Sequence, residues 1–307
     1  MTSRPRILVV IEPDNQPKNV IDRAVWLANL MNCDLELLLC DPMANPLMIG
    51  LIPSPKFSEL ERAIEQVQQG FVNDLAERAR AVGVNVTTDV VVERPVAEAI
   101  MARAELSKPR FVVKGTQYHS DAERGIMVDT DWQLARICPF PIWMVKASHF
   151  EDAPIIVAAV DPTHSHDKPA TLDTTIIQMA KSVAELTDGE VHLFHTYERL
   201  AGVGDEAMRI FRPIKLEIDK IDKKMKENHR DALDALAERN KIDDKHVHQL
   251  PGRTRDLLPS FVRSKNAQLV VMGALARWGF KRMIIGSTAE RVMDHLPCDI
   301  LIVRQDQ

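Results

Sequence analysis

The sequence has few cysteines and no motif that groups them. Cys33, Cys40, Cys138 and Cys298 are scattered along the chain, without CxxC or metal-finger spacing. Three of them lie inside apolar runs. This pattern indicates buried free thiols in a reducing compartment, and we expect a cytoplasmic protein.

Long apolar runs and an excess of positive charge are also missing. No apolar run reaches the roughly 18 residues that a membrane-spanning helix needs. The start of the chain passes through two arginines directly into the short run Ile7–Ile11, so we expect neither a signal peptide nor a membrane span. The formal net charge of −5 argues against broad binding to nucleic acid, which needs a concentrated basic face.

What the sequence does contain is the same unit twice. Ile156–Pro162 repeats the strand, acid and proline of Ile7–Pro13. From the third strand of each half onward the two halves align without a gap, and Gly115 then falls on Gly273. Such self-similarity indicates an internal duplication.

The length of 307 residues is enough for two domains with a core each. We expect these domains at residues 1–148 and 149–307, joined by the polar segment Ala147–Ala153. In each half, apolar strands alternate with helices, which is typical of a parallel sheet covered on both faces. The prediction is an α/β fold of two tandem, doubly wound, five-stranded parallel sheets.

The C-terminal stretch contains a candidate phosphate-binding site. The apolar run Leu269–Gly273 is followed by a basic loop, and Gly286 then opens a helix that Ser287 or Thr288 caps. A helix start beyond a buried strand offers unpaired N–H groups and the positive end of a dipole to a phosphate. Asp161, after the first strand of this half, is expected at the same edge of the sheet. The alternative is a plain strand–helix connection.

These residues resemble the universal stress protein family. The resemblance occurs once in each half and so covers the whole chain. In the family's pattern an aspartate follows the first strand, and a late G-x-x-G motif is followed, after nine residues, by Gly-Ser or Gly-Thr; in this chain Asp161, Gly273 and Gly286-Ser287 match that pattern. The resemblance implies a flavodoxin-like (Rossmann-like) fold, a role in the stress response and, in one branch of the family, ATP binding. It implies nucleotide contacts from Asp161, Met272, Gly273, Ala276, Gly286, Ser287 and Thr288.

The sequence departs from the family's pattern at several positions. Ala276 replaces the second glycine, and its methyl group costs about 1 kcal/mol if the backbone there must be left-handed. In the first half, Glu12 replaces the aspartate, Tyr118 the second glycine and Val128-Asp129 the Gly-Ser pair. We therefore expect the first half to be a degenerate copy, kept for structure or for another ligand.

The family also pairs single domains through their last strands. In this chain Pro141–Val145 and Ile300–Val303 would be those strands, paired within one chain as an internal pseudo-dimer. Such pairing removes an exposed edge from each sheet. A further homodimer of two chains remains open.

A loop after the first strand of the second half is a candidate metal site. Asp161, His164, His166 and Asp167 lie close together in the sequence. Imidazoles and carboxylates at this density bind zinc, with His164 and His166 as the first ligands. The alternative is a polar loop whose histidines face solvent.

Two further histidine pairs are expected to be structural. His246 and His248 lie two apart on an expected strand and so share a face, but no further metal ligands can be placed beside them. His192 and His195 are an odd number apart on another strand, so they point to opposite faces and form no joint site.

The best functional prediction is a stress-response regulator with ATP or another nucleotide bound in its second half. No nucleophile–base pair stands out, so any hydrolysis of ATP is expected to be slow. One alternative is an adaptor that binds a protein partner or an apolar small molecule through the Met-rich loop Met43–Ile52. Another is a weak ATPase that depends on Mg²⁺ or Zn²⁺.

Overall fold

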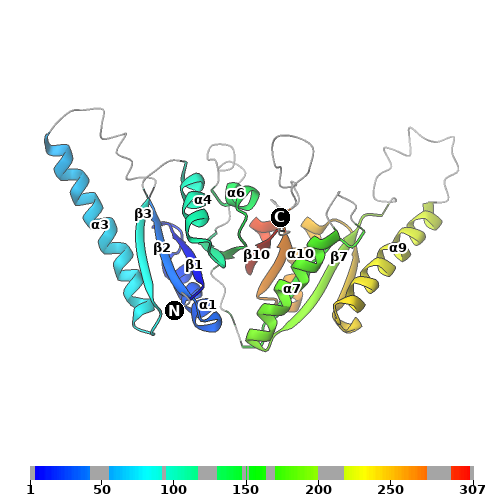
Figure 1. Ribbon diagram of the computed structural model, residues 1–307. Helices are drawn as coiled ribbons and strands as arrows, with labels where there is room; N and C mark the ends of the chain where they lie inside the picture. Colours follow the sequence, from blue (N-terminus) through cyan, green and yellow to red (C-terminus); the bar gives the residue numbers. More distant parts are fainter. Residues whose placement is uncertain are drawn as a thin grey trace, which may run out of the picture. The chain divides into compact units, whose positions relative to one another are not determined.

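The chain folds into two compact α/β units, seen in the computed structural model in Figure 1. The first unit is Met1–Ser148 with Asp299–Ile302, and the second is His149–Cys298 with Val303–Gln307. The structure describes residues 4–41, 55–91, 95–116, 130–146, 150, 152–163, 170–199, 218–274 and 292–304.

The first unit is a doubly wound parallel sheet in the order β3-β2-β1-β4-β5. The reversal beside β1 confirms the expected winding. After its first residue, Arg6, strand β1 is apolar because helices cover both faces of the sheet, and Ile7 to Ile11 are at most 1% exposed. The elements are β1 (Arg6–Ile11), α1 (Pro17–Met31), β2 (Asp34–Cys40), α3 (Pro55–Arg80), β3 (Val86–Val91), α4 (Val96–Ser107), β4 (Phe111–Gly115), α6 (Thr130–Ile137) and β5 (Ile142–Val145).

The second unit repeats this order with β9-β6-β7-β8, whose strands are also parallel. Its first strand again lies between the second strand and the strand that carries the late glycine. The elements are β6 (Ile155–Ala159), α7 (Ala170–Thr187), β7 (Glu190–Tyr197), α9 (Ile218–Arg239), the 3₁₀ turn η3 (Asp244–His246), β8 (Val247–Pro251), α10 (Thr254–Lys265) and β9 (Leu269–Gly273).

The last strand of the chain, β10 (Asp299–Val303), pairs antiparallel with β5. Ile300 lies opposite Met144, and Ile302 lies opposite Ile142. The expected pairing of the two last strands is therefore confirmed. It gives β5 a hydrogen-bonded neighbour in place of an open edge.

One buried carboxylate holds the start of β10 in the first unit. Asp299 is fully buried, and its Oδ2 lies 2.8 Å from Nε of Arg23. The indole N–H of Trp143 donates to the same oxygen at 2.8 Å, and the backbone N–H of Lys146 donates to Oδ1 at 2.9 Å. Burial lowers the pKa of Arg23 and raises that of Asp299, while their mutual attraction opposes both shifts.

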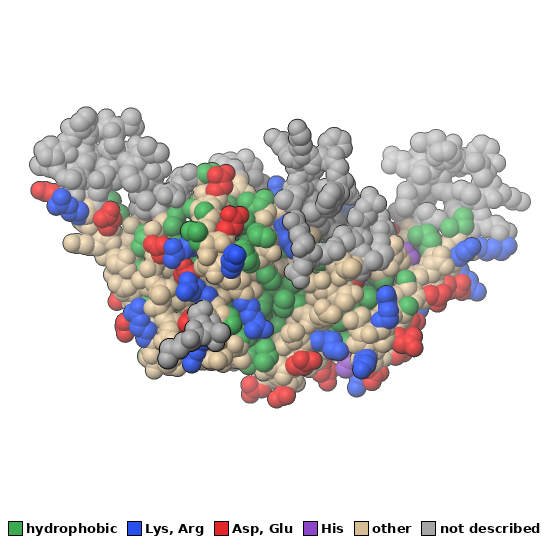
Figure 2. Space-filling view, viewed as in Figure 1, with side chains coloured by type: hydrophobic (Ala, Val, Ile, Leu, Met, Phe, Trp, Pro, Cys, Tyr) green, Lys and Arg blue, Asp and Glu red, His purple; other side chains and the backbone are tan. Residues whose placement is uncertain are grey.

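The described surface carries charges of both signs. Figure 2 shows Lys and Arg side chains lying among Asp and Glu side chains on the face in view. All four cysteines are free and buried, as the sequence predicted. Burial raises the pKa of Cys40 to about 12, so this thiol stays protonated and unreactive. Among the described helices, none is long and apolar enough to cross a membrane.

Candidate functional site

The candidate nucleotide site lies where β6 and β9 end. These strands are parallel neighbours, with Ala159 opposite Met272. Asp161, just after β6, and Gly273, the last residue of β9, therefore lie at one edge of the sheet. The structure therefore brings these two predicted residues to the same edge. The other predicted residues, Ala276, Gly286, Ser287 and Thr288, lie outside the described residues, as do His164, His166 and the loop Met43–Ile52.

Local hydrogen bonds fix the half-buried Asp161. Its backbone N–H donates to Oδ1 of Asp173 at 3.1 Å, and the hydroxyl of Thr163 donates to its Oδ1 at 3.0 Å. Asp173 is fully buried in the first turn of α7. The turn after β6 is thus anchored to the helix that follows it, which sets where the Asp161 carboxylate lies.

Gly273 has a packing role that the sequence did not reveal. A Cβ atom at this position would lie 2.7 Å from Cδ2 of Leu172 and 3.3 Å from Cδ1 of Ile176. A larger residue here would therefore force the Leu172 side chain of α7 to move, and glycine lets this side chain pack directly against the end of β9. The backbone N–H of the next residue, Ala274, donates to the carbonyl of Val303 at 2.9 Å, so it is already engaged.

The first unit fills the corresponding edge with its own ion pairs. Nζ of the buried Lys114 lies 2.6 Å from Oε2 of Glu12 and 2.5 Å from Oδ1 of Asp131. Desolvation lowers the pKa of Lys114, but these carboxylates more than offset it, so the net pKa is raised. Asn15 donates to Glu12 at 2.9 Å and to the carbonyl of Gly115 at 2.8 Å. The Asp131 carboxylate, in the first turn of α6, thus lies where the positive end of the helix dipole would otherwise favour a bound phosphate.

Two stacked histidines lie next to the Asp161 edge. Nδ1 of His195 lies 3.1 Å from the carbonyl of Val160, so it carries a proton and donates. Its Nε2 then accepts from Nδ1 of His229 at 2.7 Å. Burial lowers the pKa of both imidazoles, and the nearby Asp161 opposes this by raising them. Both rings are therefore neutral at pH 7.

The role of His229 was missed in the sequence, although a signal was present. His229 lies on α9 four residues before Leu233 and seven before Leu236, both of which are buried. It thus belongs to the inward-facing stripe of α9, which the spacing of these leucines indicates.

We expect acid to destabilise the second unit through the pair His195–His229. Their folded-state pKa values are lowered from the unfolded value of about 6.5, so the unfolded chain binds more protons below that pH. The stabilisation is complete above about pH 6.5 and is lost as the pH falls through the lowered folded-state pKa values. Urea unfolding in metal-free buffer from pH 7.5 to 5 should show this loss. In His195→Asn the slope of stability against pH should be smaller, and an unchanged slope would contradict the assignment.

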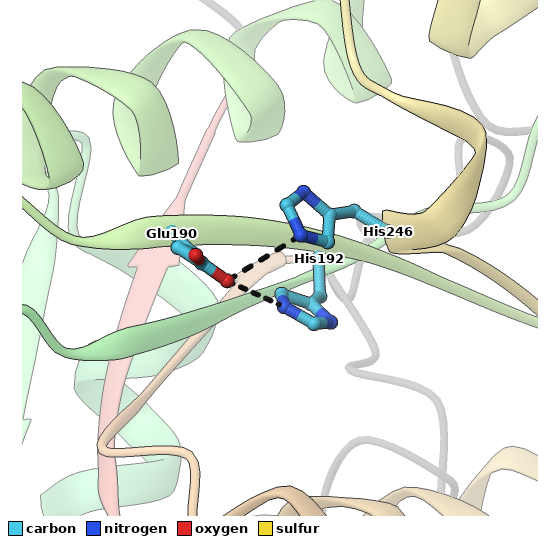
Figure 3. A group of neighbouring side chains, drawn as sticks. All are labelled: Glu190, His192 and His246. Carbon is cyan, nitrogen blue, oxygen red and sulfur yellow. Dashed lines mark ion pairs between the residues drawn. The ribbon is translucent and has the colours of Figure 1, made fainter.

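A second histidine cluster lies at the opposite edge, where β7 and β8 begin (Figure 3). His246 lies in the 3₁₀ turn η3 and not on the strand with His248, so its expected place on the strand is wrong. The side chain of Asp243 accepts from the backbone N–H of Lys245 at 3.2 Å and stabilises this turn before the strand begins. His192 contacts both His246 and His248, whereas His195 lies elsewhere, as expected.

Comparison with known proteins gives the family. The model of the universal stress protein family matches residues 4–146 and again 152–304. Universal stress protein E of Photorhabdus laumondii is 25% identical over 315 aligned residues, which span 100% of this chain and 96% of that protein.

Two solved structures from Pseudomonas aeruginosa show the same fold. A functionally unknown protein of strain PAO1 has a TM-score of 0.73 at 23% identity, covering 99% of this chain and 93% of its own. A putative universal stress protein of strain UCBPP-PA14 has a TM-score of 0.71 at 24% identity, covering 98% and 93%. Because the family model matches both halves, the chain belongs to the universal stress protein family, in a tandem form that resembles universal stress protein E.

Proposed function

We propose that this protein is a cytoplasmic stress-response regulator that binds ATP or another nucleotide in its second unit. The observation that carries the proposal is that Asp161 and Gly273 both lie at the carboxyl ends of the neighbouring parallel strands β6 and β9. Ligands of doubly wound sheets bind at this edge, beside the first strand. Met272 lies on β9. Ala276, Gly286, Ser287 and Thr288 lie outside the described residues, and their part in the proposal is the one that the sequence predicts, a connecting loop and a helix start that hold the phosphates.

The two units differ in a way that favours nucleotide binding in the second unit over the first. In the first, Lys114 and Asp131 occupy this edge with a cation and an anion of the protein. In the aligned second half, their counterparts are Met272 and Ala289, which are uncharged. The second unit therefore does not carry the internal lysine and carboxylate that fill the first, and one nucleotide per chain is the expected stoichiometry.

The test is calorimetric titration of MgATP into the full chain and into Gly286→Asp. We expect micromolar binding at one site in the wild type and at least a tenfold loss in the variant, because the new carboxylate repels the phosphates. The matched control is Val128→Asp, the same change at the aligned position of the first unit, which should leave the affinity unchanged.

Other outcomes would reject the proposal. Equal affinities in the wild type and Gly286→Asp would show that the predicted helix start does not hold the phosphates. Absence of binding to the wild type would mean that the methyl group of Ala276 excludes the triphosphate and would favour the adaptor alternative. If MgATP binds, release of inorganic phosphate with and without chelator measures any hydrolysis, which we expect to be slow.

A further inference from the structure

We propose that Glu190, His192 and His246 form a binding site for a divalent transition-metal ion of the zinc type. These side chains converge where β7 begins and η3 ends, as Figure 3 shows. The site lies at the amino ends of the strands, at the opposite edge from Asp161 and Gly273. It is therefore independent of the proposed nucleotide site.

The distances fit a small, tightly coordinating ion. Oε2 of Glu190 lies 3.6 Å from Nε2 of His192 and 3.4 Å from Nε2 of His246. One ligand atom from each residue lies within 4.8 Å of the others. Zinc binds nitrogen and oxygen at about 2.0–2.1 Å in a tetrahedron, which places neighbouring ligand atoms about 3.3 Å apart. The carboxylate contacts are already near this value, and the two imidazoles need only move together.

His192 presents a buried nitrogen without a hydrogen-bond partner among the described residues. The residue is only 5% exposed, and its Nε2 atom makes no hydrogen bond to any described residue. Its other nitrogen, Nδ1, lies 2.9 Å from Nε2 of His248. When Nδ1 donates to His248, the Nε2 lone pair faces the Glu190 carboxylate. Two acceptors facing each other repel, and a shared cation removes that repulsion.

His248 provides the support that metal-binding histidines usually have. A ligating imidazole commonly donates its second N–H to a neighbouring acceptor, which fixes its tautomer and orientation. His248 is in the right position because its ring stacks on His192, with centroids 5.1 Å apart and planes inclined by 8°. Burial lowers the pKa of His192, and it lowers that of His248 to about 4. Both rings are thus neutral at pH 7, the form that coordination requires.

The surroundings leave room for one more ligand. Glu190 is exposed, and a surface hollow beside it is lined by Asp188, Lys241, Asp243 and His246. Three protein ligands with a solvent-facing fourth position form an open zinc site. The positive charge of Lys265 also acts on His192 and His248, which opposes a bound cation and favours moderate affinity over a permanent structural ion.

The experiment is titration of ZnCl₂ into the EDTA-treated, dialysed full chain, with MgCl₂ as comparison. We expect one zinc ion per chain and no binding of magnesium at the same concentration, because magnesium prefers oxygen ligands. Glu190→Gln and His246→Asn should each lower zinc affinity at least tenfold. Both side chains are partly exposed, so these variants should fold, which circular dichroism verifies.

Two more variants distinguish zinc binding at this site from zinc binding at other histidines of the chain. His229→Asn, which removes another half-buried histidine of the same unit, should leave the zinc affinity unchanged. His248→Phe, which keeps a ring but removes the acceptor for His192, should weaken zinc about 10–100-fold. The proposal is overturned if the wild type binds no zinc, or if Glu190→Gln and His246→Asn bind it as tightly as the wild type.

Discussion

Asp299→Asn is expected to lower the free energy of unfolding of the first unit by about 3–5 kcal/mol, because it leaves Arg23 as a buried, uncompensated charge. Arg23 is 8% exposed and Asp299 is fully buried, with 2.8 Å between Nε and Oδ2. Asparagine retains much of the shape but not the charge. The same carboxylate also accepts from Trp143 and from the backbone of Lys146, so the start of β10 should loosen from β5.

Urea unfolding followed by tryptophan fluorescence measures the loss of stability in the first unit. Trp26, Trp132 and Trp143 all lie in the first unit, so they report mainly on its transition. The control is Asp22→Asn, which breaks the exposed 3.1 Å pair with Arg78 and should cost less than about 1 kcal/mol.

A double variant tests whether the charge itself is responsible. Adding Arg23→Met to Asp299→Asn removes both members of the pair, so no buried charge is left alone. The double variant should be more stable than Asp299→Asn, because replacing a whole buried pair is far less costly than breaking it. If Asp299→Asn unfolds at the wild-type urea concentration, the carboxylate does not hold β10.

Much of the fold could be predicted because its signals are local. Runs such as Ile7–Ile11 and Leu269–Gly273 are apolar throughout, which identifies strands buried on both faces. The gapless repeat then predicts the strand order of one unit from that of the other. The family resemblance further predicted that β5 and β10 pair, which the register confirms.

The polar interactions inside the fold could not be predicted in the same way. Asp299 lies 156 positions from Trp143, and Lys114 lies 102 from Glu12, and no periodicity identifies such partners. In the sequence, Lys114 interrupts an apolar run without any sign of two carboxylates beside it. The predicted strand position of His246 was wrong for a local reason. Asp243 caps a 3₁₀ turn that contains His246, so the strand begins only after it.

One signal for the proposed metal site was available but not used. Glu190 and His192 lie two apart on β7, so they share a face of that strand. The sequence cannot show that η3 brings His246 to the same place, because a turn between a helix and a strand has no fixed direction. Convergence of the three ligands is therefore a property of the folded chain alone.

Lys114→Met is expected to destabilise the first unit by about 3–5 kcal/mol at pH 7, because it leaves two carboxylates close together without their cation. Lys114 is 2% exposed, and its Nζ lies 2.6 Å from Glu12 and 2.5 Å from Asp131. Methionine is the residue at the aligned position 272, so its size suits such a strand end. Urea unfolding followed by tryptophan fluorescence measures the loss.

The second half of the chain suggests the compensating change. Its residues aligned with Lys114 and Asp131 are Met272 and Ala289, so Lys114→Met with Asp131→Ala reproduces that arrangement. The double variant should recover most of the stability lost in Lys114→Met, since it leaves only the partly exposed Glu12 without its cation. If Lys114→Met is as stable as the wild type, the lysine does not hold these carboxylates together. If the double variant is no better than Lys114→Met, the loss comes from packing and not from charge.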